Sequence, residues 1–194
     1  MNALDMRRDT ESEAVELETA RLRIREIELS DQADLFEHWS NPTYLEHVPV
    51  EPYTPDAIAA VIRRTQFLRS KEPRTNFLLV ACDKVSGRFV GDGSLKIRSA
   101  TAGQAEIGYS IRHDRAASGL ATELAMALMD FGFSRLGLHR IYARCRVENG
   151  ASRRIMAKLG MAEEGILRQD VRARGEWWSS IQCSILATDW ADLR

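Results

Sequence analysis

One short stretch limits the possible folds of this chain more than any other. Residues 105–111, AEIGYSI, are typical of a β-strand, and residues 112–125, RHDRAASGLATELA, pass from small and polar residues into strong helix formers. A turn of small residues between a strand and a helix leaves main-chain N–H groups without partners at the positive end of the helix dipole. Such a turn can bind phosphate. The stretch therefore predicts a strand, a phosphate-binding turn and a helix.

The patterns on both sides of this stretch predict a single α/β (α+β) domain. Strands are expected at residues 21–27, 76–82, 89–97, 105–111, 139–147, 162–173 and 176–188, and helices at 31–41, 57–69, 121–136 and 152–159. A helix between two strands of one sheet requires a parallel, right-handed crossover. We therefore expect a mixed, mostly antiparallel sheet of about seven strands, flanked by helices on both faces.

The length of 194 residues allows one compact domain with a substantial core. Residues 1–16 mix charges without a period and are expected to form a flexible tail, so that the domain comprises residues 17–194. Between Pro42 and Pro55 the sequence holds four prolines and predicts a stiff surface loop. This loop is either a connector or the mouth of a substrate site, to which Tyr44 and Tyr53 would contribute.

Charge and cysteine content exclude several partners. The 27 basic and 28 acidic residues give a formal charge of −1, so no net field attracts nucleic acid or an anionic membrane. No apolar run approaches the roughly 20 residues of a membrane span. The three scattered cysteines have no partner at zinc spacing, which predicts a protein without metal in a reducing cytoplasm.

Five blocks of sequence, in order, resemble the GNAT superfamily of acetyl-CoA-dependent N-acetyltransferases, and most closely its ribosomal-protein alanine N-acetyltransferase group. The blocks are LETARL at 17–22, AEIGY at 105–109, GLATE at 119–123, ENGAS at 148–152 with KLGM at 158–161, and EGILR at 164–168. The similarity extends from about residue 17 to residue 190.

The resemblance implies that the strands at 105–111 and 140–147 splay apart, with acetyl-CoA between them. The turn would bind the pyrophosphate through its N–H groups, and the exposed strand edges would pair with the pantetheine arm like an added strand. The residues expected to contact acetyl-CoA are Ser110, Ile111, Arg112, Arg115, Ser118, Gly119, Leu120, Ala121, Thr122, Asn149 and Ser152.

Two positions depart from the family's pattern. Ala116 stands where the pyrophosphate loop usually carries Arg or Gln, so Arg115 or Arg112 would supply the charge. Met156 stands where many members carry a tyrosine that protonates the departing thiolate, and methionine cannot donate a proton. These departures keep open a non-catalytic acyl-CoA-binding regulatory module as an alternative.

Acetyl transfer to an amine needs a neutral amine, a stabilised oxyanion and an exit for the thiolate. Glu106 is the candidate base and acceptor-binding residue, although it could instead pair with an arginine. A main-chain N–H near Ser110 or Ile111 is the expected oxyanion donor. Ser152 is the candidate acid, although it could simply belong to the first turn of its helix.

The acceptor that the resemblance implies is a protein N-terminus. At pH 7 roughly one α-amine in seven is neutral, compared with about one lysine in 2,500, so an α-amine demands little of a base. A small-molecule N-acetyltransferase, acting on an antibiotic or a polyamine, is the alternative on the same fold, and an acidic pocket would favour it. A homodimer remains open.

Overall fold

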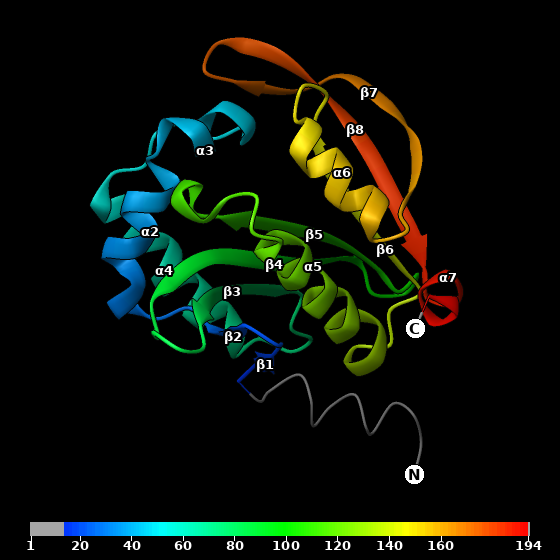
Figure 1. The fold of residues 1–194 in the computed structure, drawn as a ribbon, viewed down its shortest axis with the longest axis horizontal. Helices are drawn as coiled ribbons and strands as arrows, with labels where there is room; N and C mark the ends of the chain where they lie inside the picture. The colour runs from blue at the N-terminus through cyan, green and yellow to red at the C-terminus, as the bar shows by residue number, and fades with distance from the viewer. Residues whose placement is uncertain (1–13, 194) are drawn as a thin grey trace.

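The computed structural model describes residues 14–193, which form an eight-stranded sheet covered by helices (Figure 1). The strands lie in the order β1-β2-β3-β4-β5-β6-β8-β7, and all neighbours are antiparallel except β5 and β6. Their bounds are β1 Glu16–Glu18, β2 Leu22–Glu26, β3 Asn76–Asp83, β4 Phe89–Ser99, β5 Gln104–Ile111, β6 Arg140–Arg146, β7 Ala162–Ala173 and β8 Glu176–Leu186. The predicted α/β fold is confirmed, with eight strands instead of about seven.

The additional strand, β1, begins at the end of the predicted tail. The tail expected over residues 1–16 falls mostly outside the described residues, but Val15 is buried and its N–H donates to Glu26 at 3.1 Å. Glu16 begins β1, which pairs with β2 at the edge of the sheet. The exposed charges of Glu16 and Glu18 concealed this strand, because charged residues are common on edge strands.

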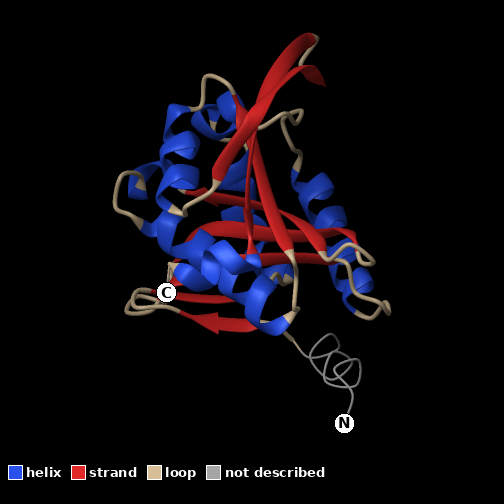
Figure 2. Cartoon of the chain, turned by 90° about the vertical axis from the view of Figure 1, so that its right-hand side faces the viewer, coloured by secondary structure: helices blue, strands red, loops and turns tan. Residues whose placement is uncertain are grey.

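Helices cover both faces of the sheet (Figure 2). Their bounds are η1 Leu29–Asp31, α2 Gln32–Trp39, α3 Pro42–His47, α4 Pro55–Arg69, η2 His113–Arg115, α5 Leu120–Asp130, η3 Phe131–Arg135, α6 Gly150–Lys158 and α7 Ala187–Asp192. Helix α5 buries Leu124 in one core, where Leu79 of β3 also lies, whereas α2 buries Leu35 in a second core beside Val80. Successive strand residues point to opposite faces, so β3 serves both cores. No helix in the described part of the chain is long and apolar enough to cross a membrane.

The proline-rich segment is not wholly a loop, because it contains α3. Asn41 caps this helix by accepting a hydrogen bond from the N–H of Thr43 at 2.9 Å, and Pro42 occupies its first position. Proline is favourable there because the first N–H of a helix has no partner anyway. The Asn–Pro pair at the end of the helix expected over residues 31–41 therefore begins α3.

The parallel strands β5 and β6 separate along their length. Their pairing covers three residue pairs, from Gln104 with Arg140 to Glu106 with Tyr142, although β5 continues to Ile111. Beyond Glu106 and Tyr142, the described residues of β6 pair only with β8, and those of β5 pair only with β4. The predicted splay is thus present, and it leaves a gap between the two halves of the sheet.

Glu164 ties the outer strand β7 to its neighbours. Its carboxylate accepts hydrogen bonds from Arg140 on β6 and from Gln182 and Ser184 on β8, at 2.6–2.9 Å. The Arg140 guanidinium and then the Ser184 hydroxyl lower the pKa of Glu164 to about 2. This carboxylate is therefore ionised at neutral pH.

Candidate active site

The turn between β5 and α5 presents main-chain N–H groups toward one point. Gly119 precedes α5 with φ +81°, in the left-handed region that favours glycine, and Ala117 has φ +58°. Among the described residues, no hydrogen-bond acceptor is found for the N–H groups of Ala117, Ser118 and Gly119. The first N–H groups of α5, at Leu120–Thr122, add to this set because a helix N-terminus leaves them unpaired. Unpaired N–H groups at a helix N-terminus are the arrangement that binds anions in other proteins.

Arg21 and Glu123 hold this turn in place. The Arg21 guanidinium donates to the carbonyl oxygen of Ser118 at 2.8 Å and pairs with Glu123 at 2.6 Å. Glu123 also accepts hydrogen bonds from the Thr19 hydroxyl at 2.5 Å and from the Arg21 N–H at 2.8 Å. Burial alone would raise the pKa of Glu123, but the hydrogen bonds from Thr19 and Arg21 lower it. The start of the domain thereby fixes the turn.

The two arginines expected to supply charge to the turn are both engaged. Arg112 pairs with Glu37 at 2.9 Å and with Asp114 at 3.1 Å, and Arg115 pairs with Asp83 at 3.2 Å. Each would have to exchange a carboxylate for a ligand phosphate. The main-chain N–H groups are consequently the donors at this turn that have no partner among the described residues.

Beside the gap between β5 and β6, the phenol of Tyr109 lies close to the hydroxyl of Ser152. The Tyr109 Oη of β5 lies 3.2 Å from the Ser152 Oγ in the first turn of α6. Asn149 caps α6 by accepting from the N–H of Ser152 at 2.9 Å, and so positions that residue. Burial raises the pKa of Tyr109 to about 12, against the opposing effect of the hydrogen bond with Ser152. Met156, in the same helix, is fully buried.

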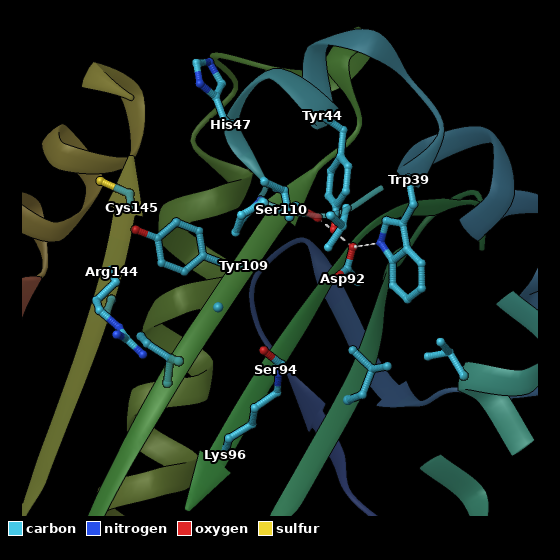
Figure 3. A pocket seen from close by; sticks show the side chains of 18 of the residues that line it. Trp39, Tyr44, His47, Asp92, Ser94, Lys96, Tyr109, Ser110, Arg144 and Cys145 are labelled. Atoms are coloured by element: carbon cyan, nitrogen blue, oxygen red, sulfur yellow. Dashed lines mark hydrogen bonds between the residues drawn. The ribbon is translucent and has the colours of Figure 1, made fainter. Parts of the chain in front are cut away.

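A cavity of about 440 Å³ extends from this pair along the face of the sheet (Figure 3). Its volume lies in the range of small-ligand sites. Tyr44 and Tyr53 line it, as do Tyr109, Ser110 and Ser152. The structure thus brings Tyr44 and Tyr53 of the proline-rich segment to one cavity with Ser110, Asn149 and Ser152, three of the residues predicted at the cofactor site.

The inner wall of the cavity holds a polar network centred on Asp92. The indole N–H of Trp39 donates to Asp92 Oδ1 at 2.9 Å, and the hydroxyl of Ser110 donates to the same oxygen at 2.6 Å (Figure 3). His38 Nε2 lies 2.8 Å from Ser110 Oγ. Because the Ser110 proton points to Asp92, His38 must be the donor in that contact. The second carboxylate oxygen, Oδ2, makes no hydrogen bond with the described residues.

The aromatic residues around Asp92 keep water away from it. Asp92 is only 8% exposed. Burial, and then the charge of Asp92, raises the pKa of Tyr44 well above its ordinary value, and the same causes raise the pKa of Tyr53. A carboxylate in such surroundings interacts strongly with an incoming positive charge, because little solvent screens it.

Glu106, the predicted base, lies elsewhere. Its carboxylate accepts from Arg98 at 2.9 and 2.5 Å and from Arg144 at 3.3 Å. It is not among the described residues that line the cavity. Its lone pairs face two guanidinium groups, so it is poorly placed to take a proton from an amine. Asp92 was missed, although an acidic residue between two glycines in an apolar strand is unusual and marks the position.

The tip of the β7–β8 hairpin is attached to the segment after α3, where Val48 and Val50 line the cavity. Arg174 donates to the main-chain carbonyl oxygens of Leu45 at 2.6 Å, Val48 at 3.2 Å and Val50 at 2.7 Å. In Figure 1 the hairpin tip accordingly lies over α3. The guanidinium also lies 4.6 Å from the ring centroid of Trp178. These contacts fix the segment that carries Tyr44.

Comparisons with known proteins agree with this geometry. The family model described as an acetyltransferase (GNAT) domain matches residues 21–162. An uncharacterised N-acetyltransferase of Bacillus subtilis (strain 168) is 27% identical over 179 residues, which cover 89% of this chain and 97% of that protein.

Two solved structures share the fold. Spermidine N-acetyltransferase from Vibrio cholerae, in complex with CoA and spermine, matches with a TM-score of 0.79 at 21% identity, covering 89% of this chain and 99% of that one. Ribosomal-protein-S5-alanine acetyltransferase from Vibrio fischeri matches with a TM-score of 0.77 at 24% identity, covering 91% and 98%. With a family model that matches well over half of its length, this chain belongs to the GNAT family of N-acetyltransferases.

Proposed function

We propose that this protein transfers the acetyl group of acetyl-CoA to the α-amine at the N-terminus of a protein or peptide, by direct attack in a ternary complex. The observation that carries the proposal is the single cavity that joins Asp92 to the Tyr109–Ser152 pair beside the gap between β5 and β6. The part of the cavity at Asp92 suits an amine, and the part at the Tyr109–Ser152 pair suits a departing thiolate.

The residues present fit coenzyme A. The N–H groups of residues 117–119 and the start of α5 would hold the pyrophosphate, and the unpaired edge of β5 beyond Glu106 would pair with the pantetheine arm. Bound acetyl-CoA supplies a thioester, whose carbonyl carbon accepts an amine. Ser110 and Ile111 lie on that edge, so a main-chain N–H there is the proposed oxyanion donor.

Asp92 is the proposed partner of the acceptor amine. Its Oδ2 is free of hydrogen bonds with the described residues, while Trp39 and Ser110 hold Oδ1. This arrangement fixes the carboxylate of a residue that lines the cavity and leaves one of its oxygens available to a ligand. An α-ammonium group bound there could pass its proton to Asp92, directly or through a water molecule. His38 would position Ser110 within this network.

Tyr109 and Ser152 are proposed to assist the thiolate. A thiol has a reference pKa of about 8.5, whereas the pKa of Tyr109 is raised to about 12 by burial. Complete proton transfer from the phenol to the sulfur would be unfavourable by several pKa units. The pair is therefore expected to stabilise the thiolate by hydrogen bonding through the Ser152 hydroxyl, with Tyr109 as its support.

The charge of the cavity favours this acceptor over a polyamine. Asp92 is the only carboxylate among the described residues that line it, and Arg64, Lys96 and Arg144 line it as well. A polycation would meet more positive than negative charge there, which costs free energy. A single α-amine requires only one carboxylate.

The proposal is tested by incubating the protein with acetyl-CoA and a panel of peptides, while measuring CoA release and the mass of each peptide. Every peptide is accompanied by a twin with a blocked N-terminus, and spermidine and an aminoglycoside complete the panel. Acetylation of free but not blocked peptides is expected. Equal labelling of the twins, or turnover only with the polyamine or the aminoglycoside, refutes the α-amine acceptor. CoA binding without any turnover identifies a non-catalytic module.

A further inference from the structure

Two cations that form no ion pair with the described residues line the cavity, Lys96 at the end farther along β4 from Asp92 and Arg64 on α4, the helix that packs on β3 (Figure 3). Arg64 of α4 and Lys96 of β4 are both exposed, and neither forms a hydrogen bond or ion pair with any of the described residues. Figure 3 shows Lys96 on the same strand as Asp92, farther along the cavity. Most arginines elsewhere around the site are paired, so these free charges are distinctive.

The other charged groups nearby offset one another. Arg144 lines the cavity but pairs with Glu106 at 3.3 Å and with Asp170 at 3.8 Å. Glu106 in turn pairs with Arg98 at 2.5 Å. These two carboxylates are thus occupied by two guanidinium groups. Glu106 also lies opposite Lys96 in the β4–β5 register but forms no ion pair with it. Four cations, Arg64, Lys96, Arg98 and Arg144, therefore face two carboxylates, and the excess positive charge comes from Arg64 and Lys96.

An unpartnered polar atom lies beside the two cations. Asn76, the cross-strand neighbour of Lys96, lines the same end of the cavity. Its buried Oδ1 has no hydrogen-bond partner among the described residues. A buried acceptor without a donor is rare in a folded protein and indicates a missing donor. A peptide N–H of a bound ligand would provide one.

We infer that this end of the cavity is an anion subsite, which selects acceptors with acidic side chains at the third or fourth residue from the α-amine. The inference rests on the proposed function, because it places that amine at Asp92. From Asp92 to Lys96 is four residues of β4, or roughly 13 Å at about 3.3 Å per residue. An extended acceptor peptide advances by a similar distance per residue, so its third and fourth side chains reach Arg64 and Lys96.

The test compares three peptides that differ only at these positions: Ala-Ala-Glu-Glu, Ala-Ala-Gln-Gln and Ala-Ala-Lys-Lys, each extended by the same neutral tail. Wild type is expected to prefer the Glu peptide over the Gln peptide by about tenfold in kcat/KM, as two solvent-accessible ion pairs allow. The preference should appear in KM rather than kcat, because the subsite is remote from the reacting atoms. It should weaken at 0.5 M salt, where the charges are screened.

Variants assign the preference to these residues. The double variant Arg64→Gln/Lys96→Gln should lose the preference for Glu while keeping its kcat on the Gln peptide. Lys96→Glu should shift the preference toward the Lys peptide. Arg63→Gln is the matched control, because Arg63 neighbours Arg64 on α4 and is exposed but does not line the cavity. It should behave as wild type.

Each outcome decides the matter. Equal kcat/KM for the three peptides, or an equal loss of the preference in Arg63→Gln, overturns the anion subsite and leaves the proposed function standing. No transfer to any of the three peptides overturns both. A preference for Glu that disappears only in the Arg64 and Lys96 variants establishes the subsite.

Discussion

Replacing Asp92 by Asn is the sharpest test of how the acceptor amine is activated. Asparagine keeps an oxygen that can accept from Trp39 and Ser110, as Asp92 Oδ1 does at 2.9 and 2.6 Å. The change removes the negative charge and places an amide NH₂ at the cavity side. Folding should survive, with a melting temperature within about 4 °C of wild type, the shift that corresponds to roughly 1 kcal/mol.

The expected loss in kcat/KM at pH 7 is about 100-fold, at the lower end of the range for a general base. The loss is no larger because roughly one α-amine in seven is already neutral at this pH. At pH 9 more than nine in ten α-amines are neutral, so the kcat/KM of the Asp92→Asn variant should rise roughly sevenfold between pH 7 and pH 9. This rise should follow the fraction of acceptor amine that is neutral. Wild type should gain less.

The assay is the steady-state rate of CoA release, measured from pH 6.5 to pH 9.5 with a saturating acetyl-CoA concentration. Glu106→Gln serves as the comparison, because Glu106 is the base that the sequence suggests and its carboxylate is held by Arg98 and Arg144. This second variant should lose less than about threefold. A larger loss for Glu106→Gln than for Asp92→Asn, or an unchanged pH profile for Asp92→Asn, would refute the role given to Asp92.

Three further substitutions test other parts of the molecule. Gly119→Val should weaken CoA binding by at least about tenfold in a calorimetric titration, because valine is strained at φ +81°. Arg115→Ala should change the affinity for CoA by less than about threefold. Equal effects of the two substitutions would contradict a role of the turn in binding the CoA phosphates. Ser152→Ala should lower kcat by about tenfold, because the departing thiolate loses a hydrogen-bond donor. The KM for acetyl-CoA should change little, because the cap that Asn149 gives α6 uses the main-chain N–H of residue 152 and not the hydroxyl. An unchanged kcat contradicts the role of this serine. Glu164→Gln should lower the free energy of unfolding at pH 7 by about 1 kcal/mol, after allowance for the partial exposure of its side chain. The pKa of Glu164 is lowered to about 2 in the folded state, so its contribution is complete above the unfolded value of about 4.3 and disappears as the pH falls toward 2. Glu163→Gln, at an exposed pair, is the control and should change the free energy of unfolding at pH 7 by less than about 0.5 kcal/mol; an equal loss in both variants would contradict the role given to Glu164.

Local signals in the sequence predicted most of the fold and the position of the turn between β5 and α5. The alternation of apolar and polar residues gave the strands, and Asn149 and Gly160 marked the ends of α6, where the structure has a cap and φ +74°. The pattern at residues 105–125 also placed the turn correctly between β5 and α5. Each of these features depends on neighbours within a few residues, which is the range that periodicity and capping report.

The acceptor side of the site depended on contacts that no local pattern reports. Trp39 and Asp92 are 53 positions apart and meet only because α2 packs across β4. Glu106 looked available in a strand taken alone, but the register of the sheet places Arg98 and Arg144 against it. Whether a carboxylate is free or paired is a property of packing, and so it emerges only when the elements are assembled.

The Arg174 contacts have a consequence for how this cavity can vary. The guanidinium binds the carbonyl oxygens of Leu45, Val48 and Val50, and every amino acid supplies a carbonyl oxygen. The side chains of this segment can therefore be exchanged without loss of its attachment to the hairpin. An anchor of this kind holds the backbone of residues 45–50 while leaving their side chains open to change, so the lining that Val48 and Val50 provide can be altered on an unchanged framework.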